Sequence, residues 1–194
     1  MANVRTRAVS REEFEKIIST MKTGFIQPTG ERVKPNERIA TALVLEANLG
    51  LRIGDIVHLH LSDIVRENGR YRLDIIEQKT KKVRTFTVPT DIYIYLQTYA
   101  LEHDLRPTQL LFDISVRAVQ VHLQLVCKHL GISGVGTHSF RKFFAQEIYK
   151  NSDYDLTLVQ HLLQHSSLTV TQHYLTVDSK QVEDALQNHI YLPA

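Results

Sequence analysis

Side chains in the last third of the chain combine the residue types that phosphate chemistry needs. The segment "THSFRK" holds His138 and Arg141, and the segment "LLQHSSLTVTQHYL" holds His165 and Tyr174. Arg52, in "NLGLRIGD", adds a second arginine. A guanidinium offers a planar fork of donors that matches phosphate oxygens, and such donors gain strength as charge builds in a transition state. Two arginines and two histidines around one phosphate are therefore the arrangement that this set suggests.

A tyrosine beside such a phosphate would be its nucleophile. The phenol has a reference pKa of about 10, so a site that works at neutral pH must draw its proton away. A neutral histidine is suited to that task. Taken singly, Tyr174 is more simply a core phenol, and His138 and Arg141 are more simply surface residues. The hypothesis of a site depends on the ordered set.

Other chemistries find less support in the sequence. The chain contains neither a glycine-rich phosphate loop nor a Gly-x-Ser-x-Gly elbow. His161 and His165 have a metal-ligand spacing, but Leu162 stands where zinc hydrolases carry a glutamate. We therefore expect no metal and no cofactor. The same segment also fits a helix-turn-helix, with Ser166 and Ser167 in the turn.

Length and composition indicate an ordinary globular protein. The chain has 194 residues, enough for one domain with a proper core. Its single cysteine, Cys127, excludes an internal disulfide framework. No apolar run approaches the ~20 residues that span a bilayer, and the N-terminal residues lack the apolar stretch of a secretory signal. We expect a cytoplasmic protein with no membrane partner.

Charge favours a nucleic-acid partner only locally. The net charge is +2. Such a small excess says little, but one short stretch is strongly basic and holds Arg66, Arg70, Arg72, Lys79, Lys81, Lys82 and Arg84. This run is either a solvated face or a patch that holds phosphates while the whole chain stays near neutral.

Helices must position most of the candidate residues. Ser10 and Glu13 have the spacing of a capping box before an apolar-periodic run. A second helix is predicted between Asn36 as its cap and Gly50 past its end, and Arg52 follows that stop directly. The Pro- and Gly-containing stretch between the two helices indicates a loop.

A small sheet interrupts the helical pattern. β-rich runs at 69–78 and 83–89 flank "KTKK", and with "LSDIVRE" they predict a small antiparallel sheet. Helical spacing returns from residue 91 onward. The predicted fold class is mainly α (α+β), with a single helical domain that carries the small antiparallel sheet early in the chain.

The motifs together resemble the catalytic domain of the tyrosine recombinases, also called the phage integrase family. "NLGLRIGDIVHLHLSDI" is similar to the family's first-arginine block, which implies a catalytic Arg52 with Asp55 as its acidic neighbour. "THSFRK" is similar to the His-x-x-Arg block, which implies catalytic roles for His138 and Arg141. The resemblance thus assigns the two arginines to one active site.

Two further blocks complete the resemblance. "LLQHSSLTVTQHYL" is similar to the block that ends in the nucleophile, which implies catalytic roles for His165 and Tyr174. "EQKTKKVRTFTVP" is similar to the β-hairpin that carries the family's catalytic lysine. Lys79 matches the Lys-Thr form of that hairpin, whereas Lys81 matches when spacing is counted back from Pro89, and we favour Lys79. Basic residues of these blocks that we expect to bind DNA are Lys81, Lys82, Arg84 and Lys142.

The sequence departs from the family pattern at two points. Gln164 stands where the family most often has glycine, and we interpret this as a matter of backbone or packing. The catalytic domain is expected to occupy residues 1–194, with a core over about 10–178, so the N-terminal core-binding domain that closes around DNA is expected to be absent. The chain would then be either a shortened piece or a naturally minimal protein.

The resemblance implies a site-specific recombinase or integrase of a mobile element. Tyr174 would attack the scissile phosphate of double-stranded DNA and form a 3′-phosphotyrosyl link without metal or ATP. Arg52, Arg141 and His165 would stabilise the charged phosphorus, His138 would assist proton removal, and the hairpin lysine would protonate the leaving 5′-oxygen. The alternatives are a binding-only regulatory protein on the same scaffold and a related enzyme that relaxes DNA or resolves its ends.

The C-terminal residues predict a tail helix. Residues 179–194 carry an apolar side at near-helical spacing. This helix either packs on its own domain or, as the resemblance implies, docks on a neighbouring subunit. The family acts as tetramers on two duplexes, so we expect a homo-tetramer on paired target sites.

Overall fold

The computed structural model describes residues 6–78, 81, 83–164, 167–172 and 174–175. The chain divides into two compact units, residues 1–144 and 145–194, and each is described by itself. The predicted boundary between the core and the tail at about residue 178 lies outside the described residues and stays a prediction.

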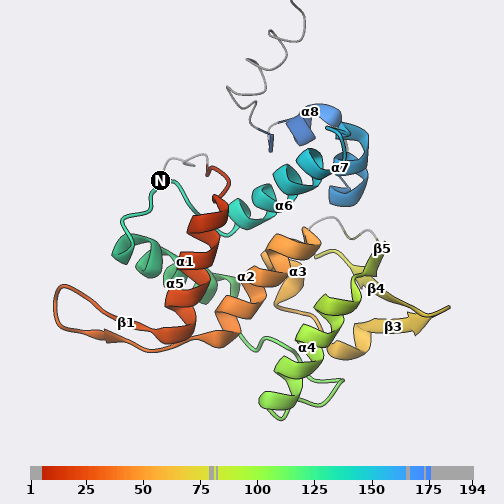
Figure 1. The fold of residues 1–194 in the computed structure, drawn as a ribbon. Helices are drawn as coiled ribbons and strands as arrows, with labels where there is room; N and C mark the ends of the chain where they lie inside the picture. The colour runs from red at the N-terminus through yellow and green to blue at the C-terminus, as the bar shows by residue number, and fades with distance from the viewer. Residues whose placement is uncertain (1–5, 79–80, 82, 165–166, 173, 176–194) are drawn as a thin grey trace, which may run out of the picture. The chain divides into compact units, whose positions relative to one another are not determined.

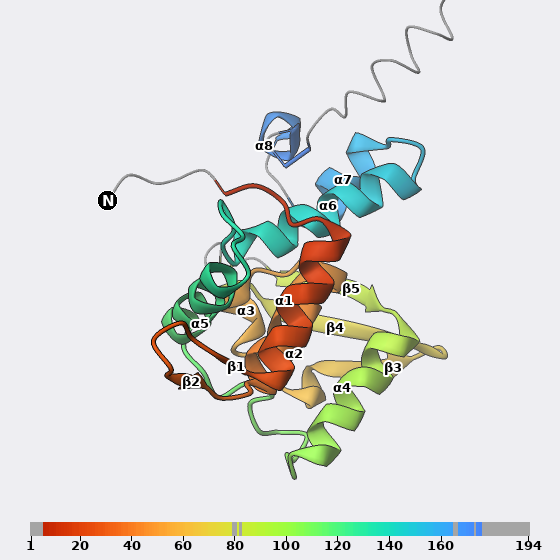
Figure 2. The ribbon, with the colours of Figure 1, turned by 60° about the vertical axis from the view of Figure 1, so that its left-hand side comes forward.

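Local capping signals define the first two long helices of the first unit. α1 (Arg11–Thr23) begins after Ser10, and the predicted capping box with Glu13 is present. α2 (Glu37–Leu49) begins after Asn36, whose side chain accepts a hydrogen bond from the first turn at 3.1 Å. Both predicted starts are confirmed, and the two helices lie side by side in both views (Figures 1 and 2).

The segment between these helices is more regular than predicted. β1 (Phe25–Ile26) and β2 (Arg32–Val33) form a short antiparallel pair, seen below α1 in Figure 2. The turn is closed by a hydrogen bond from the Gln27 amide to the Glu31 carbonyl at 2.8 Å. The stretch predicted as a loop is therefore a small hairpin.

The antiparallel sheet predicted from the sequence is confirmed. α3 (Ile53–Ile56) and a 3₁₀ turn (Leu61–Asp63) lead into three strands in the order β3–β4–β5. The strands are β3 (Ile64–Glu67), β4 (Arg70–Ile76) and β5 (Val83–Val88). α4 (Thr90–Glu102) covers this sheet (Figures 1 and 2), and Tyr93 of α4 stacks on Tyr71 of β4 with ring centroids 3.8 Å apart.

The core of the first unit surrounds α2. Ala40, Ala42, Leu43 and Leu45 are all fully buried, so this helix has almost no solvent face. A helix that is apolar on nearly every side belongs in the centre of a domain. Its C-terminal end is consequently a rigid base for the residues that follow it.

Two more helices complete the arrangement around that base. α5 (Val116–His129) begins after Ser115, whose side chain accepts from the first turn at 3.1 Å. α6 (His138–Asn151) begins at the predicted His-x-x-Arg motif. Its first turns pack on α1 through Phe14, whose ring stacks on that of Phe143 at 5.5 Å and meets that of Phe140 edge-on at 6.1 Å.

The second unit is also helical. α7 (Leu156–Leu163) begins after Asp155, whose carboxylate accepts from the first-turn amides at 2.8 and 2.9 Å. α8 (Leu168–Gln172) follows, and the buried side chains of Val159, Leu163 and Thr171 form the interior of this pair. The mainly helical fold class is confirmed.

Candidate active site

The end of α2 places Arg52. Gly50 closes the helix in the left-handed conformation at φ 58°, and its neighbour Leu51 is fully buried. Arg52 is then the N-terminal cap residue of α3, with an extended backbone. Because Leu51 and Ile53 on either side are both buried, the backbone of Arg52 is fixed and its side chain is only 18% exposed.

Arg141 is held against the same piece of backbone. It lies in the first turn of α6, three residues after His138, and is fully buried. Its Nη1 donates a hydrogen bond to the carbonyl of Gly50, two residues before Arg52. The structure therefore brings the neighbourhoods of the two predicted arginines together, although 91 residues separate Gly50 from Arg141. His138 is exposed at the start of α6.

A buried carboxylate lies near Arg141. Glu46, one turn before the end of α2, is fully buried. Burial raises the pKa of this carboxyl well above its ordinary value, while the positive charge of Arg141 and the backbone amide of Ile53 act in the opposite direction. Because the raised pKa favours the neutral form of Glu46, this carboxyl offsets the charge of Arg141 less than an ordinary carboxylate would.

The turn end of the β4–β5 hairpin contacts the Arg52 segment at two points. Glu77, 1% exposed, forms an ion pair with Arg52 in which Oε2 lies 2.6 Å from Nη1. Asp55, the predicted acidic neighbour, is buried, and its Oδ1 accepts a hydrogen bond from the amide of Gln78 at 2.7 Å. The predicted first-arginine block and the hairpin are thus joined.

The predicted basic residues have different surroundings. Lys79 and Lys82 lie outside the described residues, and Arg84 is in β5. Lys81 is exposed, with its backbone in the left-handed region at φ 56°. The ammonium of Lys142 donates a hydrogen bond to the carbonyl of Thr6. The role of Lys142 in DNA binding stays a prediction.

Part of the basic run is a solvated face. Arg72 forms ion pairs with Glu67 and with Asp74, the latter at 2.8 Å, and each of these side chains is at least 39% exposed. This guanidinium is already matched by two carboxylates on the surface of the sheet. Of the two interpretations of the basic run, the solvated face therefore applies to Arg72, and it need not apply to the other residues of the run.

The second unit holds the predicted nucleophile. Tyr174 follows α8, and its amide donates to the carbonyl of Thr171 at 2.9 Å. Its carbonyl accepts from the Gln146 side chain at 3.4 Å, and the residue is half-buried. His165 lies outside the described residues. The preceding Gln164 caps α7 in the left-handed conformation at φ 50°, which is the backbone reason why glycine suits this position.

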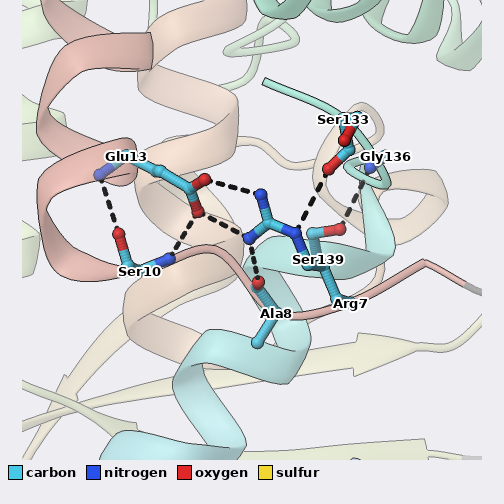
Figure 3. Close-up of polar contacts among 7 residues, drawn as sticks. All are labelled: Arg7, Ala8, Ser10, Glu13, Ser133, Gly136 and Ser139. Atoms are coloured by element: carbon cyan, nitrogen blue, oxygen red, sulfur yellow. Dashed lines mark hydrogen bonds and ion pairs between the residues drawn. The ribbon is translucent and has the colours of Figure 1, made fainter. Parts of the chain in front are cut away.

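A polar clamp fixes the loop that precedes α6 (Figure 3). Arg7 forms two contacts with Glu13, at 2.7 and 2.5 Å, and its Nε donates to the carbonyl of Ser133 at 3.2 Å. Its amide also donates to the carbonyl of Gly134 at 2.9 Å. The Arg7 guanidinium holds the pKa of Glu13 below its ordinary value. The segment before α1 is thereby tied to the loop that leads to His138.

The described part of the chain offers no cluster of three metal-ligating side chains. His161 is in α7, but its predicted partner His165 is not described, so the metal-ligand spacing of this pair stays untested. No helix within the described ranges is long and apolar enough to cross a membrane.

Comparison with known proteins identifies the family. Residues 7–181 match the model of the phage integrase family, and the chain belongs to this family. It is 28% identical over 151 residues to the probable integrase/recombinase YoeC of Bacillus subtilis, covering 74% of this chain and 80% of that protein. It is 32% identical over 159 residues to the tyrosine recombinase XerC of Methylobacterium sp., covering 77% of this chain and 49% of that protein. The chain thus spans about half the length of XerC relatives.

Solved structures show the same fold. The XerH site-specific recombinase bound to its difH substrate, in a post-cleavage complex, matches 96% of this chain and 54% of its own with a TM-score of 0.72 at 21% identity. The catalytic domain of bacteriophage HP1 integrase matches 95% of both chains with a TM-score of 0.64 at 15% identity. The fold is that of a tyrosine recombinase catalytic domain, as the motifs predict.

Sequence reasoning missed two acidic residues of the site. Glu46 lies in a helix outside the matched blocks, and Glu77 directly follows β4 within the hairpin block, at a position to which the resemblance assigns no role. A signal was available for Glu77, because the alternation of β4, continued one residue past its end, places Glu77 on the inward side with Leu73. A carboxylate at an inward strand position predicts a buried cationic partner.

Proposed function

We propose that this chain is the catalytic part of a site-specific DNA recombinase or integrase. It would cleave and rejoin strands through a 3′-phosphotyrosyl intermediate, with neither metal nor ATP. The observation that carries the proposal is the hydrogen bond from Arg141 to the carbonyl of Gly50, because it holds one motif arginine against the backbone that leads to Arg52. Membership of the phage integrase family supports the same conclusion.

In the proposed first step, the Tyr174 oxygen bonds to the scissile phosphorus and the bond to the 5′-oxygen breaks. His138 assists removal of the phenol proton, and Lys79 gives a proton to the departing oxygen, so the step is balanced. The two arginines and His165 stabilise the negative charge that grows on the phosphoryl oxygens.

The second step is the reverse of the first with a different strand. The 5′-hydroxyl of a partner strand attacks the phosphotyrosyl phosphorus and releases Tyr174. One phosphate diester is exchanged for another at each step, so the bond energy is kept in the covalent link and no nucleotide is consumed.

The proposed partner is double-stranded DNA in the cytoplasm. Solved relatives of this fold include XerH bound to difH and a λ integrase dimer bound to a COC′ core site. In this chain Lys81, Lys82 and Arg84, at the hairpin, are the proposed phosphate contacts, and Lys142 would join them on releasing the Thr6 carbonyl. We further propose four subunits on two paired sites, with the tail at 179–194 docking on a neighbour.

Trapping on a nicked suicide substrate tests the function. The wild-type chain should form a covalent protein–DNA adduct, and Tyr174→Phe should form none while still binding DNA. Tyr154→Phe is the matched control, because Tyr154 is 51% exposed and in no family block, and it should react like wild type. An adduct that persists in Tyr174→Phe, or that maps to Tyr149 or Tyr191, would refute the assignment.

Two additional measurements separate the competing functions. Excess EDTA should leave adduct formation unchanged, because arginines and histidines supply the charge that a metal supplies in two-metal nucleases. Strand exchange between two sites, measured beside relaxation of a supercoiled plasmid, distinguishes a recombinase from a relaxing enzyme. Specific DNA binding with no adduct from the wild type would instead indicate a regulatory protein.

A further inference from the structure

Glu77 is a buried charge at a position where the strand pattern calls for an apolar residue. Along β4 and the two residues that follow it, the side chains of Leu73 and Glu77 are buried, whereas those of Asp74, Ile76 and Gln78 are exposed. An unpaired carboxylate at such an inward position would cost several kcal/mol. The ion pair with Arg52 at 2.6 Å explains why this position tolerates an acid.

The same residue also closes the turn that contains the hairpin lysine. The backbone carbonyl of Glu77 accepts a hydrogen bond from the amide of Lys81 at 2.8 Å. The sequence of this five-residue turn, from Glu77 to Lys81, includes Lys79. At the start of the turn, Asp55 accepts a hydrogen bond from the Gln78 amide at 2.7 Å. The side chain of Glu77 thus binds the arginine while its backbone begins the lysine turn.

We propose that Glu77 is a positioning residue that couples Arg52 to the turn carrying Lys79. This inference depends on the proposed function, since it assigns Arg52 to the scissile phosphate and Lys79 to the leaving oxygen. The ion pair fixes the start of the β4–β5 turn on the Arg52 segment, so the proton donor and the phosphate-binding arginine would keep one relative position. The carboxylate also offsets part of the arginine charge until a phosphate arrives.

The two effects of the carboxylate predict opposite changes in binding and in chemistry. Without its negative charge, Arg52 attracts a phosphate more strongly, so DNA should bind more tightly. Without the ion pair, the lysine turn loses one of its anchors, and misplacing a catalytic group by about 1 Å costs roughly 100-fold in rate. Tighter binding together with slower cleavage is a combination that general loss of structure does not produce.

Glu77→Gln on nicked DNA tests the proposal. The DNA concentration for half-maximal rate should fall severalfold, and the adduct-forming rate at saturating DNA should fall by about 10- to 100-fold. A substrate with a 5′-phosphorothiolate at the scissile position should restore most of that rate, because a sulfur leaving group scarcely needs a proton. Rescue by sulfur assigns the defect to the proton donor rather than to charge stabilisation by Arg52.

Two other variants act as controls. Glu67→Gln removes a carboxylate that is 54% exposed and paired with Arg72, and it should change neither quantity. Glu77→Asp keeps the charge but shortens the side chain, so it should slow cleavage with sulfur rescue and leave DNA affinity unchanged. If circular dichroism shows that Glu77→Gln does not fold, Glu77→Asp tests the proposal in its place.

The outcomes distinguish this inference from the proposed function. If the wild type forms an adduct and neither Glu77 variant differs from it, the coupling is wrong. A slow Glu77→Gln variant that sulfur does not rescue also overturns it, because the lysine is then not what moved. If the wild type forms no adduct, the proposed function fails, and unchanged DNA affinity of Glu77→Gln would then overturn the electrostatic part of the inference as well.

Discussion

Gly50 combines backbone strain with a close approach, and replacing it with alanine should be strongly destabilising. Its φ of 58° lies in the left-handed region, which costs an L-residue with a side chain about 1–2 kcal/mol. A Cβ at this position would also lie 2.5 Å from Cε1 of the Phe144 ring and 3.1 Å from its Cγ. Relieving such an overlap in a packed core typically costs about 1–3 kcal/mol. The sum for Gly50→Ala is therefore about 2–5 kcal/mol.

Thermal unfolding converts this free energy into a measurable shift. For a chain of this size each 1 kcal/mol lowers the midpoint by about 2–4 °C, so Gly50→Ala should unfold about 4–20 °C below wild type. The variant should also form adduct more slowly at a temperature where it is folded, because the Gly50 carbonyl accepts the hydrogen bond from Arg141.

Two control variants separate strain from overlap. Gly69→Ala has the strain alone, since φ is 78° and an added Cβ meets no described atom within 4 Å. Gly54→Ala has neither strain nor overlap among the described residues. The unfolding midpoint should be highest for Gly54→Ala, lower for Gly69→Ala and lowest for Gly50→Ala. If Gly50→Ala were no less stable than Gly69→Ala, the close packing of Phe144 on the end of α2 would be wrong.

Three further predictions address stability and assembly. Burial raises the pKa of Glu46 above its ordinary 4.5, so the folded state loses stability as pH rises above that value, and Glu46→Gln should have a higher urea midpoint than wild type near about pH 8 but not near about pH 4. An advantage that shrinks with rising pH would contradict this. Arg7→Ala should lower the free energy of unfolding by roughly 1 kcal/mol, because the Arg7 side chain is 47% exposed and its ion pair with Glu13 is partly screened. Glu13→Gln should then cost less in the Arg7→Ala background than in the wild type, as urea unfolding of the two single variants and the double variant would show; equal costs would contradict the pairing. Deleting residues 180–194 should leave a folded monomer that binds DNA but does not recombine, as measured by circular dichroism and sedimentation on paired-site DNA; intact recombination would exclude the assembly role.

Features that depend on neighbouring residues could be predicted from the sequence. Ser10 and Asn36 begin helices because their side chains accept hydrogen bonds from amides only three residues away. The small antiparallel sheet followed in the same way from β-rich runs separated by short turns. The β1–β2 hairpin was not predicted, because two-residue strands carry too little alternation to be distinguished from a loop.

The candidate active site depends on contacts that sequence spacing does not encode. The motifs named Arg52 and Arg141 through the family resemblance, but the contact that joins their surroundings involves the backbone carbonyl of Gly50, which carries no side-chain signal. Glu46 and Glu77 were missed because an acid in a helix or at the end of a strand normally faces water. The tertiary fold shows which arginine each of them lies near.

The β1–β2 turn and the single cysteine make this protein convenient for site-selective labelling. Cys127 is 5% exposed, and burial raises the pKa of its thiol to about 11, so it contains almost no thiolate at neutral pH. Thr29, in the turn, is exposed, and the neighbouring Gly30 leaves open space around it among the described residues. Because the thiolate is the reactive form, a maleimide dye should modify a Thr29→Cys variant at the new thiol and leave Cys127 unmodified. A fluorophore placed there would lie on a hydrogen-bonded turn that contains no candidate site residue, and it would report tumbling and DNA binding without prior removal of the native cysteine.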